Sequence, residues 1–317
     1  MAVEAATPAC AANSFAVQAR PSMSAISMRA RVLSAIADAT AARHSAVIDP
    51  VCDGDNSVAT ERSGGHDVRM DTFTRLHHGD EPLLLPNAWD FASAAAFVRA
   101  GFRAVGTTSL GVAASSGLPD AAGATGAETL ALARTLARLP VPVTVDIEAG
   151  FGMDPAALAA ELHAIGIAGV NIEDGRGDHL AALDEQCALI AAFKAAAPDV
   201  FVNARVDTYW LHLPTADTTR RASAYVDAGA DGVFVPGLRD ERVIEQLVAE
   251  LGDVPLNLLA QLPFRRLGEL GVRRVSTGSL PFRVAITQAA AAATAYATGA
   301  PTPAAMSYDD AQALSLS

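Results

Sequence analysis

Short, mostly apolar runs alternate with helical patterns along the chain from residue 80 onward. The segments between the runs have helical periodicity, as in residues 155–166, 184–197 and 239–252. Repeated alternation of strand and helix predicts a parallel sheet, and eight such units in about 240 residues suit a (β/α)8 TIM-type barrel of the α/β class. The eight runs are 83–86, 104–108, 141–145, 168–172, 200–204, 231–235, 255–259 and 273–277.

A doubly wound open sheet is the alternative architecture. That fold usually places a glycine-rich phosphate loop after its first strand. The first run here continues as LLLPNAWD, residues 83–90, which contains no glycine. The pattern therefore favours the barrel.

Polar side chains follow nearly every predicted strand. In a barrel of this type, active-site groups lie at the C-terminal ends of the strands. Turn chemistry explains some Asp, Asn and Ser at such places, but not Arg205 or Glu173 directly after buried strands. The strand-end residues are Asn87, Asp90, Thr108, Ser109, Asp146, Glu148, Glu173, Asp174, Arg205, Asp207, Asn257, Thr277 and Ser279.

The stretch VPVTVDIEAGFG, residues 141–152, holds two of these carboxylates close together. Residues two apart in a strand point the same way, so Asp146 and Glu148 can converge on one point. Two acids at the end of a buried strand are costly unless a positive charge neutralises them. Mg²⁺ prefers carboxylate and water oxygens, which predicts a metal site. A helix cap or a surface salt bridge is the alternative.

Composition narrows the classes of function. The 317 residues are 51% hydrophobic, with a net charge of −12 and a pI of about 4.9, which argues against a nucleic-acid surface and disfavours an anionic membrane. The three cysteines follow no metal-ligand spacing and indicate a reducing compartment, so we expect a cytoplasmic protein. No apolar run approaches the roughly 18 residues of a membrane span. The alanine-rich stretch 289–297 predicts a helix.

Residues 1–69 differ from the rest, being rich in Ala, Ser, Thr and Arg. Residues 24–44 predict one isolated helix, whereas residues 48–71 lack hydrophobic periodicity and predict loop or disorder. No secretory signal is evident. We expect a low-complexity extension over 1–69 and a single barrel domain with a short C-terminal tail over 70–317. A start at Met70, a targeting segment and a genuine tail remain open readings of the extension.

The strand-end phrases resemble those of the isocitrate lyase/phosphoenolpyruvate mutase superfamily. The resemblance covers residues 73 to 285, and its order and spacing are more specific than any single phrase. It implies a (β/α)8 barrel, Mg²⁺ dependence (with Mn²⁺ as an alternative), 2-oxo-acid substrates and a homo-oligomer, dimer or tetramer. The matching phrases are LLLPNAWDFASA, GTTSLGVAASSGLPD, PVTVDIEAGFG, GVNIEDG, VNARVDTY, ADGVFVPG and PLNLLA.

The resemblance also implies a role for individual acids. Asp146 corresponds to the direct Mg²⁺ ligand of the family. Asp120, Glu148 and Glu173 correspond to carboxylates that hold the metal, partly through water. Magnesium keeps several of its waters, so an acidic ring that acts mostly through water is physically reasonable.

The substrate-binding residues follow from the same resemblance. Ser109, Leu110 and Gly111 match the loop whose hydroxyl and backbone N–H groups hold the substrate carboxylate. Arg205 matches the arginine that binds the charged end of the substrate, for which its planar guanidinium is suited. Asn257 is expected to add another substrate contact.

Several strand-end residues have plainer interpretations. Trp89 and Asn87 are expected to pack and to support strand ends. Asp207 is expected to pair with Arg205, and Asp174 to serve as a turn acid. Only Asp146, Glu173 and Arg205 are strongly favoured as functional by both pattern and resemblance.

The chain departs from the family in the loop after the fourth strand. Family lyases carry a KKCGH motif there, and phosphonate-cleaving members a lysine-containing gating loop, but residues 175–183 contain neither. Cys187 falls in the next helical pattern and is expected to be a packing cysteine. Pro236 stands where the lyases have a glutamate and the mutase a histidine. The groups that distinguish the known reactions are therefore missing.

What remains predicts a Mg²⁺-dependent lyase that cleaves a C–C bond of a small 2-oxo or 2-hydroxy acid through a metal-stabilised, pyruvate-type enolate. Arg205, His179 and Glu173 are the expected catalytic residues, with His179 and Asp178 as candidate proton donors. The sequence equally supports the interpretation that His179 is an exposed surface histidine without a catalytic role. The alternatives are a C–P bond hydrolase or phosphonomutase, and a catalytically silent oxo-acid-binding barrel. We expect a small carboxylate as ligand, and neither a nucleic acid nor a membrane as partner.

Overall fold

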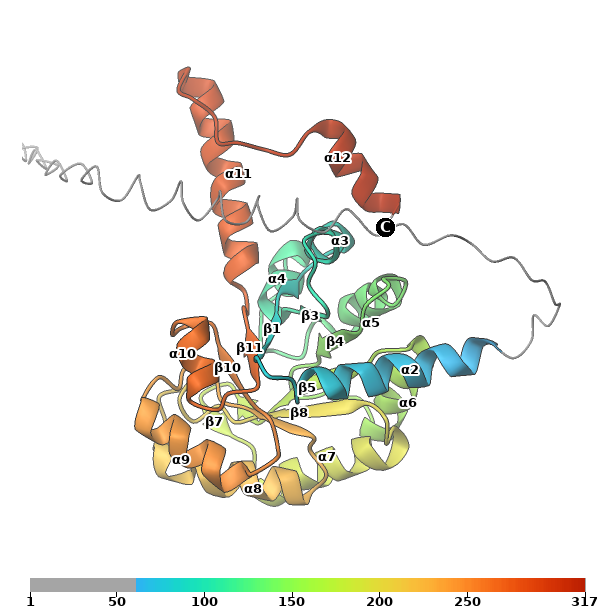
Figure 1. Cartoon of the computed structure of the whole chain (residues 1–317), viewed down its shortest axis with the longest axis vertical. Helices are drawn as coiled ribbons and strands as arrows, with labels where there is room; N and C mark the ends of the chain where they lie inside the picture. The colour runs from blue at the N-terminus through green and yellow to red at the C-terminus, as the bar shows by residue number, and fades with distance from the viewer. Residues whose placement is uncertain (1–60, 317) are drawn as a thin grey trace, which may run out of the picture. The chain divides into compact units, whose positions relative to one another are not determined.

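The computed structural model describes residues 61–316, with side chains from 69 to 315. All eight predicted runs form strands of one parallel sheet, in the expected order (Figure 1). Residues 1–60, including the helix expected over 24–44, lie outside the described residues. The strands of the sheet are β1 (Leu83–Leu85), β2 (Asn87–Ala88), β3 (Val105–Thr107), β4 (Val143–Asp146), β5 (Gly169–Glu173), β8 (Phe201–Arg205), β9 (Gly232–Phe234), β10 (Leu256–Leu259) and β11 (Arg274–Ser276).

The first strand segment closes this sheet into a barrel. Pro86, which has no backbone N–H, separates β1 from β2. β1 pairs with β11 and β2 pairs with β3, so this one segment joins the two ends of the sheet. Asn87 bridges the same seam, because its Nδ2 donates to Thr107 O (2.8 Å) while its Oδ1 accepts from Gly278 N (2.9 Å). The (β/α)8 barrel is confirmed, and Asn87 supports the strand ends as predicted.

Helices follow the strands and surround them (Figure 1). The three segments with the clearest helical periodicity form α6 (Pro155–Ile165), α7 (Leu183–Ala196) and α9 (Glu241–Leu251). Cys187 on α7 packs against the core, and its Sγ lies 3.5 Å from Ala224 O, which confirms the predicted packing role. The helices are α2 (Glu61–Leu76), α3 (Phe91–Arg99), α4 (Ser109–Ser116), α5 (Gly126–Leu136), α6 (Pro155–Ile165), α7 (Leu183–Ala196), α8 (Thr218–Asp227), α9 (Glu241–Leu251), α10 (Phe264–Glu269), α11 (Leu280–Thr298) and α12 (Tyr308–Ala313).

Helix α2 closes the barrel at the N-terminal ends of the strands. Its Phe73 is fully buried, and a Cβ on Gly169, the first residue of β5, would lie only 2.7 Å from the Phe73 ring. His77, one turn later, stacks on Phe201 at the start of β8 with ring centroids 4.3 Å apart. The prediction of loop or disorder over residues 48–71 is therefore wrong from Glu61 onward. Tertiary packing at the end of α2 supports a helix that local periodicity does not signal.

The C-terminal segment runs along and beyond the barrel. Helix α11 contains the predicted 289–297 helix and buries only Phe282, leaving Val284 and Ile286 about half exposed. After α12, a short 3-10 helix (Leu314–Leu316) returns to α3, where Leu314 is buried. Within residues 61–316, no helix combines the length and apolar character needed to cross a membrane.

Candidate active site

The strand-end acids begin with Asp146, the last residue of β4. Its backbone N–H donates to the Thr107 hydroxyl (2.8 Å), which ties the end of β4 to β3. Glu148 then adopts a left-handed backbone with φ of 47°, so strand alternation does not extend past Asp146. Instead, the Glu148 N–H donates to Asp146 Oδ1 (3.1 Å). The two acids are neighbours, as predicted, but a tight turn and not a strand brings them together.

Glu148 anchors the loop that carries Asp120. Its Oε2 accepts from Gly123 N and its Oε1 from Thr125 Oγ1, both at 2.7 Å, and its side chain is almost fully buried. Both of its carboxylate oxygens therefore hold this loop. Asp120 is exposed, and its charge helps to raise the pKa of Asp146, which places it beside the same acidic cluster.

Glu173 and Arg205 form an ion pair across two adjacent strands. Glu173 ends β5 and Arg205 ends β8, and the two residues are register partners. Arg205 Nη1 lies 2.8 Å from Glu173 Oε2, and Arg205 Nε lies 2.7 Å from Asp207 Oδ1. The predicted pairing of Asp207 with Arg205 is confirmed. Among the described residues Arg205 Nη2 makes no hydrogen bond, so one edge of the guanidinium remains available.

Asp146, Glu173 and Arg205 influence one another's pKa values. Burial raises the pKa of Asp146 to about 6, opposed by Arg205 and by the hydrogen bond from the Glu148 N–H, and reinforced by the charges of Glu148 and Asp120. Burial also raises the pKa of Glu173 to about 8, with Arg205 opposing and Asp146 adding to the rise. Burial alone would lower the pKa of Arg205, but its acidic neighbours raise it, so the guanidinium stays charged. Burial and mutual repulsion therefore disfavour the charged forms of Asp146 and Glu173, and a bound cation would stabilise those charged forms.

Residues 109–111 form the first turn of α4. The first N–H groups of a helix have no intrahelical partner, and the helix dipole favours an anion there. Thr108, the N-cap, supplies no side-chain cap, so these N–H groups remain open. A Cβ on Gly111 would come within 2.7 Å of both Thr108 Cγ2 and Trp89 Cβ, so this turn needs glycine for close packing. Trp89 packs edge-to-face on Phe282, consistent with its predicted packing role.

Two predicted site residues lie apart from this cluster. Asn257 is 1% exposed inside the barrel, where its Oδ1 accepts from Ser276 Oγ (3.1 Å) and its Nδ2 has no partner. His179 lies on the hairpin formed by β6 (Gly175–Arg176) and β7 (His179–Leu180). Its side chain is 71% exposed, and its one polar contact is with Asp178 (3.1 Å). The structure does not bring either residue into hydrogen-bonding contact with the acids.

Sequence reasoning missed Arg274, the first residue of β11. It is fully buried, and its Nη2 reaches across the barrel to Asn171 Oδ1 (3.1 Å) while its Nε donates to Ser276 Oγ (3.3 Å). Burial lowers the pKa of Arg274 to about 9, against the attraction of Asp146. The only signal in the sequence was a charged residue within the run 273–277, and charge alone does not reveal a buried partner.

Two observations limit what the acids can hold. Within residues 61–316, no three His, Cys, Asp or Glu side chains are arranged to enclose a metal ion by themselves. A cavity of about 400 Å³ lies at the other end of the barrel, beside Arg75, Leu83 and Phe264, and none of the strand-end acids lines it. The acidic cluster is therefore identified by its chemistry and its place at the strand ends.

Comparison with known proteins agrees with this placement. Residues 73–297 match the family model described as phosphoenolpyruvate phosphomutase. An uncharacterised protein of Mycobacterium tuberculosis (strain CDC 1551 / Oshkosh) is 46% identical over 246 residues, covering 76% of this chain and 95% of that protein. The 2-methylisocitrate lyase of Bacillus subtilis (strain 168) is 33% identical over 202 residues, covering 60% of this chain and 66% of the lyase.

Solved structures show the same relationship. Phosphoenolpyruvate phosphomutase from Streptomyces platensis subsp. rosaceus superposes with a TM-score of 0.67 at 27% identity, covering 73% of this chain and 88% of that one. The family match spans well over half of the chain, so the resemblance seen in the strand-end phrases is confirmed. The chain belongs to the phosphoenolpyruvate phosphomutase family, within the isocitrate lyase/phosphoenolpyruvate mutase superfamily of lyases and mutases.

Proposed function

We propose that this protein is a Mg²⁺-dependent lyase that cleaves a C–C bond of a small 2-oxo or 2-hydroxy carboxylic acid. The observation that supports it is the meeting of Asp146, Glu173 and Arg205 at the C-terminal ends of three adjacent strands, β4, β5 and β8. A buried acid, Glu173, and a partly buried one, Asp146, beside a charged arginine with a free edge suit a cation and an anionic substrate together.

The donor set suits Mg²⁺, or Mn²⁺, held mainly through water. Asp146 Oδ1 accepts from a backbone N–H, which leaves Oδ2 without a protein partner among the described residues. Glu148 uses both oxygens on the neighbouring loop, and Glu173 gives one to Arg205. Magnesium commonly binds through one or two carboxylates and keeps several waters, so Asp146 would be the direct ligand and Asp120, Glu148 and Glu173 would act through water.

The chain's own residues would bind and orient the substrate. The open N–H groups of Ser109, Leu110 and Gly111 would donate hydrogen bonds to one substrate carboxylate at the start of α4. The free edge of Arg205 would hold the other end, since Asp207 and Glu173 fix the rest of the guanidinium. When bound, Mg²⁺ would supply a Lewis acid for the negative charge that develops beside the cleaved bond. Asn257 lies in the barrel interior, so any contribution that it makes to substrate binding would be indirect, through the residues packed around it.

A proton donor is needed in the cleavage direction. We propose His179, supported by Asp178, because it is a titratable group on the hairpin that directly follows Glu173 and Asp174. Its exposure means that the hairpin would have to bring it over the substrate. Replacing His179 by alanine should lower turnover strongly, and full activity on the true substrate would remove His179 from the mechanism.

A phosphonomutase or C–P hydrolase is the second candidate. The similarity to the Streptomyces platensis phosphomutase favours it. The hairpin after β5 contains no lysine, in contrast to what the family resemblance implies for phosphonate-cleaving members. Phosphonopyruvate therefore belongs in the same assay. A silent oxo-acid-binding barrel would instead bind oxalate without turning over any substrate.

A substrate panel tests the proposal. Oxaloacetate, methylisocitrate and phosphonopyruvate would be assayed with and without Mg²⁺, with the released oxo-acid detected. We expect Mg²⁺-dependent product from a C–C substrate, and Asp146→Asn should abolish it. Asp199→Asn is the matched control, because Asp199 is exposed and lies before β8, away from the strand-end acids. Product formation that is independent of metal, or insensitive to Asp146→Asn, would contradict the proposal.

We further propose that the chain forms a homo-oligomer. Helix α11 buries only Phe282, and it leaves Leu280, Val284 and Ile286 between 44% and 54% exposed. A second copy would cover this apolar surface. Light scattering should give a dimer or tetramer, and Val284→Glu combined with Ile286→Glu should shift it to monomer. A monomeric wild-type protein would refute this proposal. A cytoplasmic location remains an expectation from the cysteine content.

A further inference from the structure

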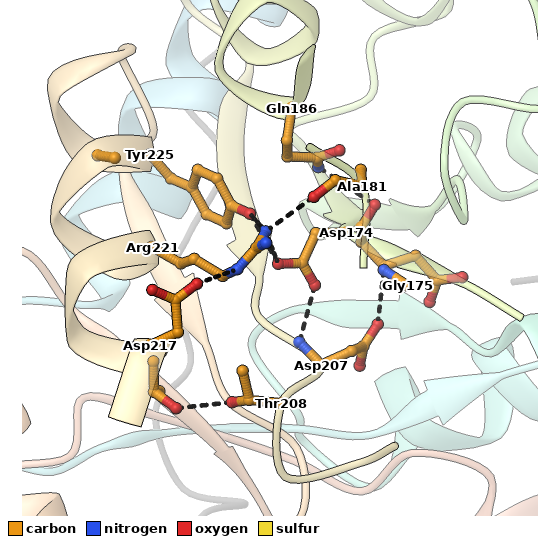
Figure 2. Close-up of polar contacts among 12 residues, drawn as sticks. Asp174, Gly175, Ala181, Gln186, Asp207, Thr208, Asp217, Arg221 and Tyr225 are labelled. Carbon is orange, nitrogen blue, oxygen red and sulfur yellow. Dashed lines mark hydrogen bonds and ion pairs between the residues drawn. The ribbon is translucent and has the colours of Figure 1, made fainter. Parts of the chain in front are cut away.

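A buried polar cluster lies behind the ion pair of the candidate site (Figure 2). Its centre is Asp174, which follows Glu173 and has no exposed surface. Its Oδ2 accepts hydrogen bonds from the Tyr225 hydroxyl (2.7 Å) and from Arg221 Nη1 (3.2 Å), both on α8. Asp174 is therefore not the simple turn acid that the sequence predicts.

The two donors on α8 are themselves held in place. Arg221 Nη1 also donates to the Tyr225 oxygen (3.0 Å) and to Ala181 O (3.1 Å), and its Nε donates to Asp217 Oδ2 (2.9 Å). Burial and the nearby Asp174 charge raise the pKa of Tyr225, so its hydroxyl stays protonated and remains a donor. A buried carboxylate is stable only when it is paired and hydrogen-bonded, and both conditions are met here.

The cluster continues to the active-site arginine through Asp207. The other oxygen of Asp174, Oδ1, accepts from the backbone N–H of Asp207 (2.8 Å). The Asp207 side chain then uses both of its oxygens. Oδ1 accepts from Arg205 Nε (2.7 Å), and Oδ2 accepts from Gly175 N (3.2 Å). One residue thus connects α8 to the guanidinium of Arg205 and to the base of the hairpin.

The position of Asp207 has little freedom. Asp207 is 1% exposed, and a Cβ on Gly175 would lie 2.7 Å from its Oδ2. Arg205 in turn lies over the rings of Trp210 and Phe234, with its Cζ 5.7 and 5.8 Å from their centroids. A shift of Asp207 would therefore be transmitted to the guanidinium, whose remaining ion pair is with Glu173.

We propose that Asp174, Arg221 and Tyr225 are positioning residues that set the place of the Arg205 guanidinium through Asp207. The proposal rests on the proposed role of Arg205 in binding the substrate carboxylate. The three residues do not contact substrate, so their substitution should weaken substrate binding more than it slows the chemical step. They are separate from the acids proposed to hold the metal.

Tyr225→Phe is the test variant, because it removes one hydroxyl and keeps the ring. With Mg²⁺ present, we expect the Kd of oxalate measured by calorimetry, and the KM of any turned-over substrate, to rise about three- to tenfold, with a smaller change in kcat. Arg221→Lys is the second variant should Tyr225→Phe fail to fold. The matched control is Asp227→Asn, since Asp227 is exposed at the end of the same helix and makes no contact with Asp174, Arg221 or Tyr225 through a hydrogen bond or ion pair. It should leave both constants unchanged.

A double-mutant cycle separates positioning from general support of the fold. In an Arg205→Lys background, Tyr225→Phe should produce almost no further change in oxalate Kd, because the group being positioned is gone. Equal effects of Tyr225→Phe in both backgrounds would overturn the proposal.

A direct probe keeps this test independent of the substrate. The Nε–H resonance of Arg205, identified by its loss in Arg205→Lys, should move in Tyr225→Phe and stay in place in Asp227→Asn. An Nε–H resonance that Tyr225→Phe leaves unmoved overturns the positioning role. An Arg205→Lys variant that binds oxalate normally would instead refute the proposed function, and the resonance would still decide the positioning.

Discussion

Acid should destabilise this fold through His77, the histidine of α2 that stacks on Phe201. His77 is 1% exposed, and its Nδ1 lies 2.9 Å from Phe73 O, so Nδ1 carries the proton of the neutral ring. Its Nε2 is buried without a partner. Burial, reinforced by the positive charge of Arg274, lowers the pKa of His77 from 6.5 to about 3. A second proton can therefore enter only at considerable cost.

The sign of the effect follows from these two pKa values. Above pH 6.5 the ring is neutral in both the folded and the unfolded chain, and its contribution to stability is complete. As the pH falls from 6.5 towards 3, the unfolded chain takes up a proton that the folded chain does not. Each pH unit in that window removes about 1.4 kcal/mol from the free energy of unfolding. Between about pH 6 and pH 4 the loss from His77 alone is roughly 2–3 kcal/mol.

Urea unfolding followed by circular dichroism measures this loss. Other groups titrate in the same range, so the comparison is with His77→Phe, which keeps an aromatic ring against Phe201 and has no titrating group. The free energy of unfolding of the wild type should fall more steeply with acid than that of His77→Phe, by about 1.4 kcal/mol per pH unit. His179→Phe, at an exposed position, should keep the wild-type slope. Equal slopes for the wild type and His77→Phe would refute the reasoning.

Three further substitutions test the framework around the site. Asn87→Ala removes the side-chain bonds across the barrel seam, and it should lower the free energy of unfolding in urea by about 2–4 kcal/mol; a loss under about 1 kcal/mol would contradict the seam role. Glu148→Gln replaces one accepting oxygen by an NH2 donor, so it should lower the free energy of unfolding by about 1–3 kcal/mol and speed amide exchange in the loop before α5. Unchanged exchange would show that Glu148 does not anchor the loop. Gly169→Ala forces a methyl group against Phe73 and should cost about 1–3 kcal/mol or more in thermal unfolding, while Gly79→Ala, with its nearest neighbour at 3.7 Å, should stay within about 0.5 kcal/mol.

The barrel was predictable because its strands are buried on both faces and so read as apolar runs. The place of Asp146, Glu173 and Arg205 was predictable for the same reason, since the ends of such runs mark one edge of the sheet. The start of α2 was not predictable, because the helix is supported by packing at its far end, around Phe73. Local periodicity carries no signal of that packing.

The polar interior of the site could not be found by spacing along the chain. Arg221 and Tyr225 meet Asp174 from 47 and 51 residues away, and Arg274 meets Asn171 from 103 residues away. Such partners are recognised only once the strands are arranged in space. The same limit explains why Glu148, expected to share the direction of Asp146, instead turns its oxygens to a loop that precedes it in the chain.

The backbone of the hairpin after β5 is attached at both of its ends. Gly175 N donates to Asp207 at its entry, and Ala181 N donates to the backbone oxygen of Asp174 (2.8 Å) at its exit. Both anchors are backbone N–H groups outside residues 176–180. Between them, Arg176 adds side-chain bonds to Glu173 O (3.0 Å) and to Gln186 Oε1 (3.1 Å), which a replacement segment would lose. The hairpin is thus an exchangeable module. A longer segment from a related lyase could be grafted between the two anchors, and the chemistry of the barrel could be changed there without rebuilding the strands beneath it.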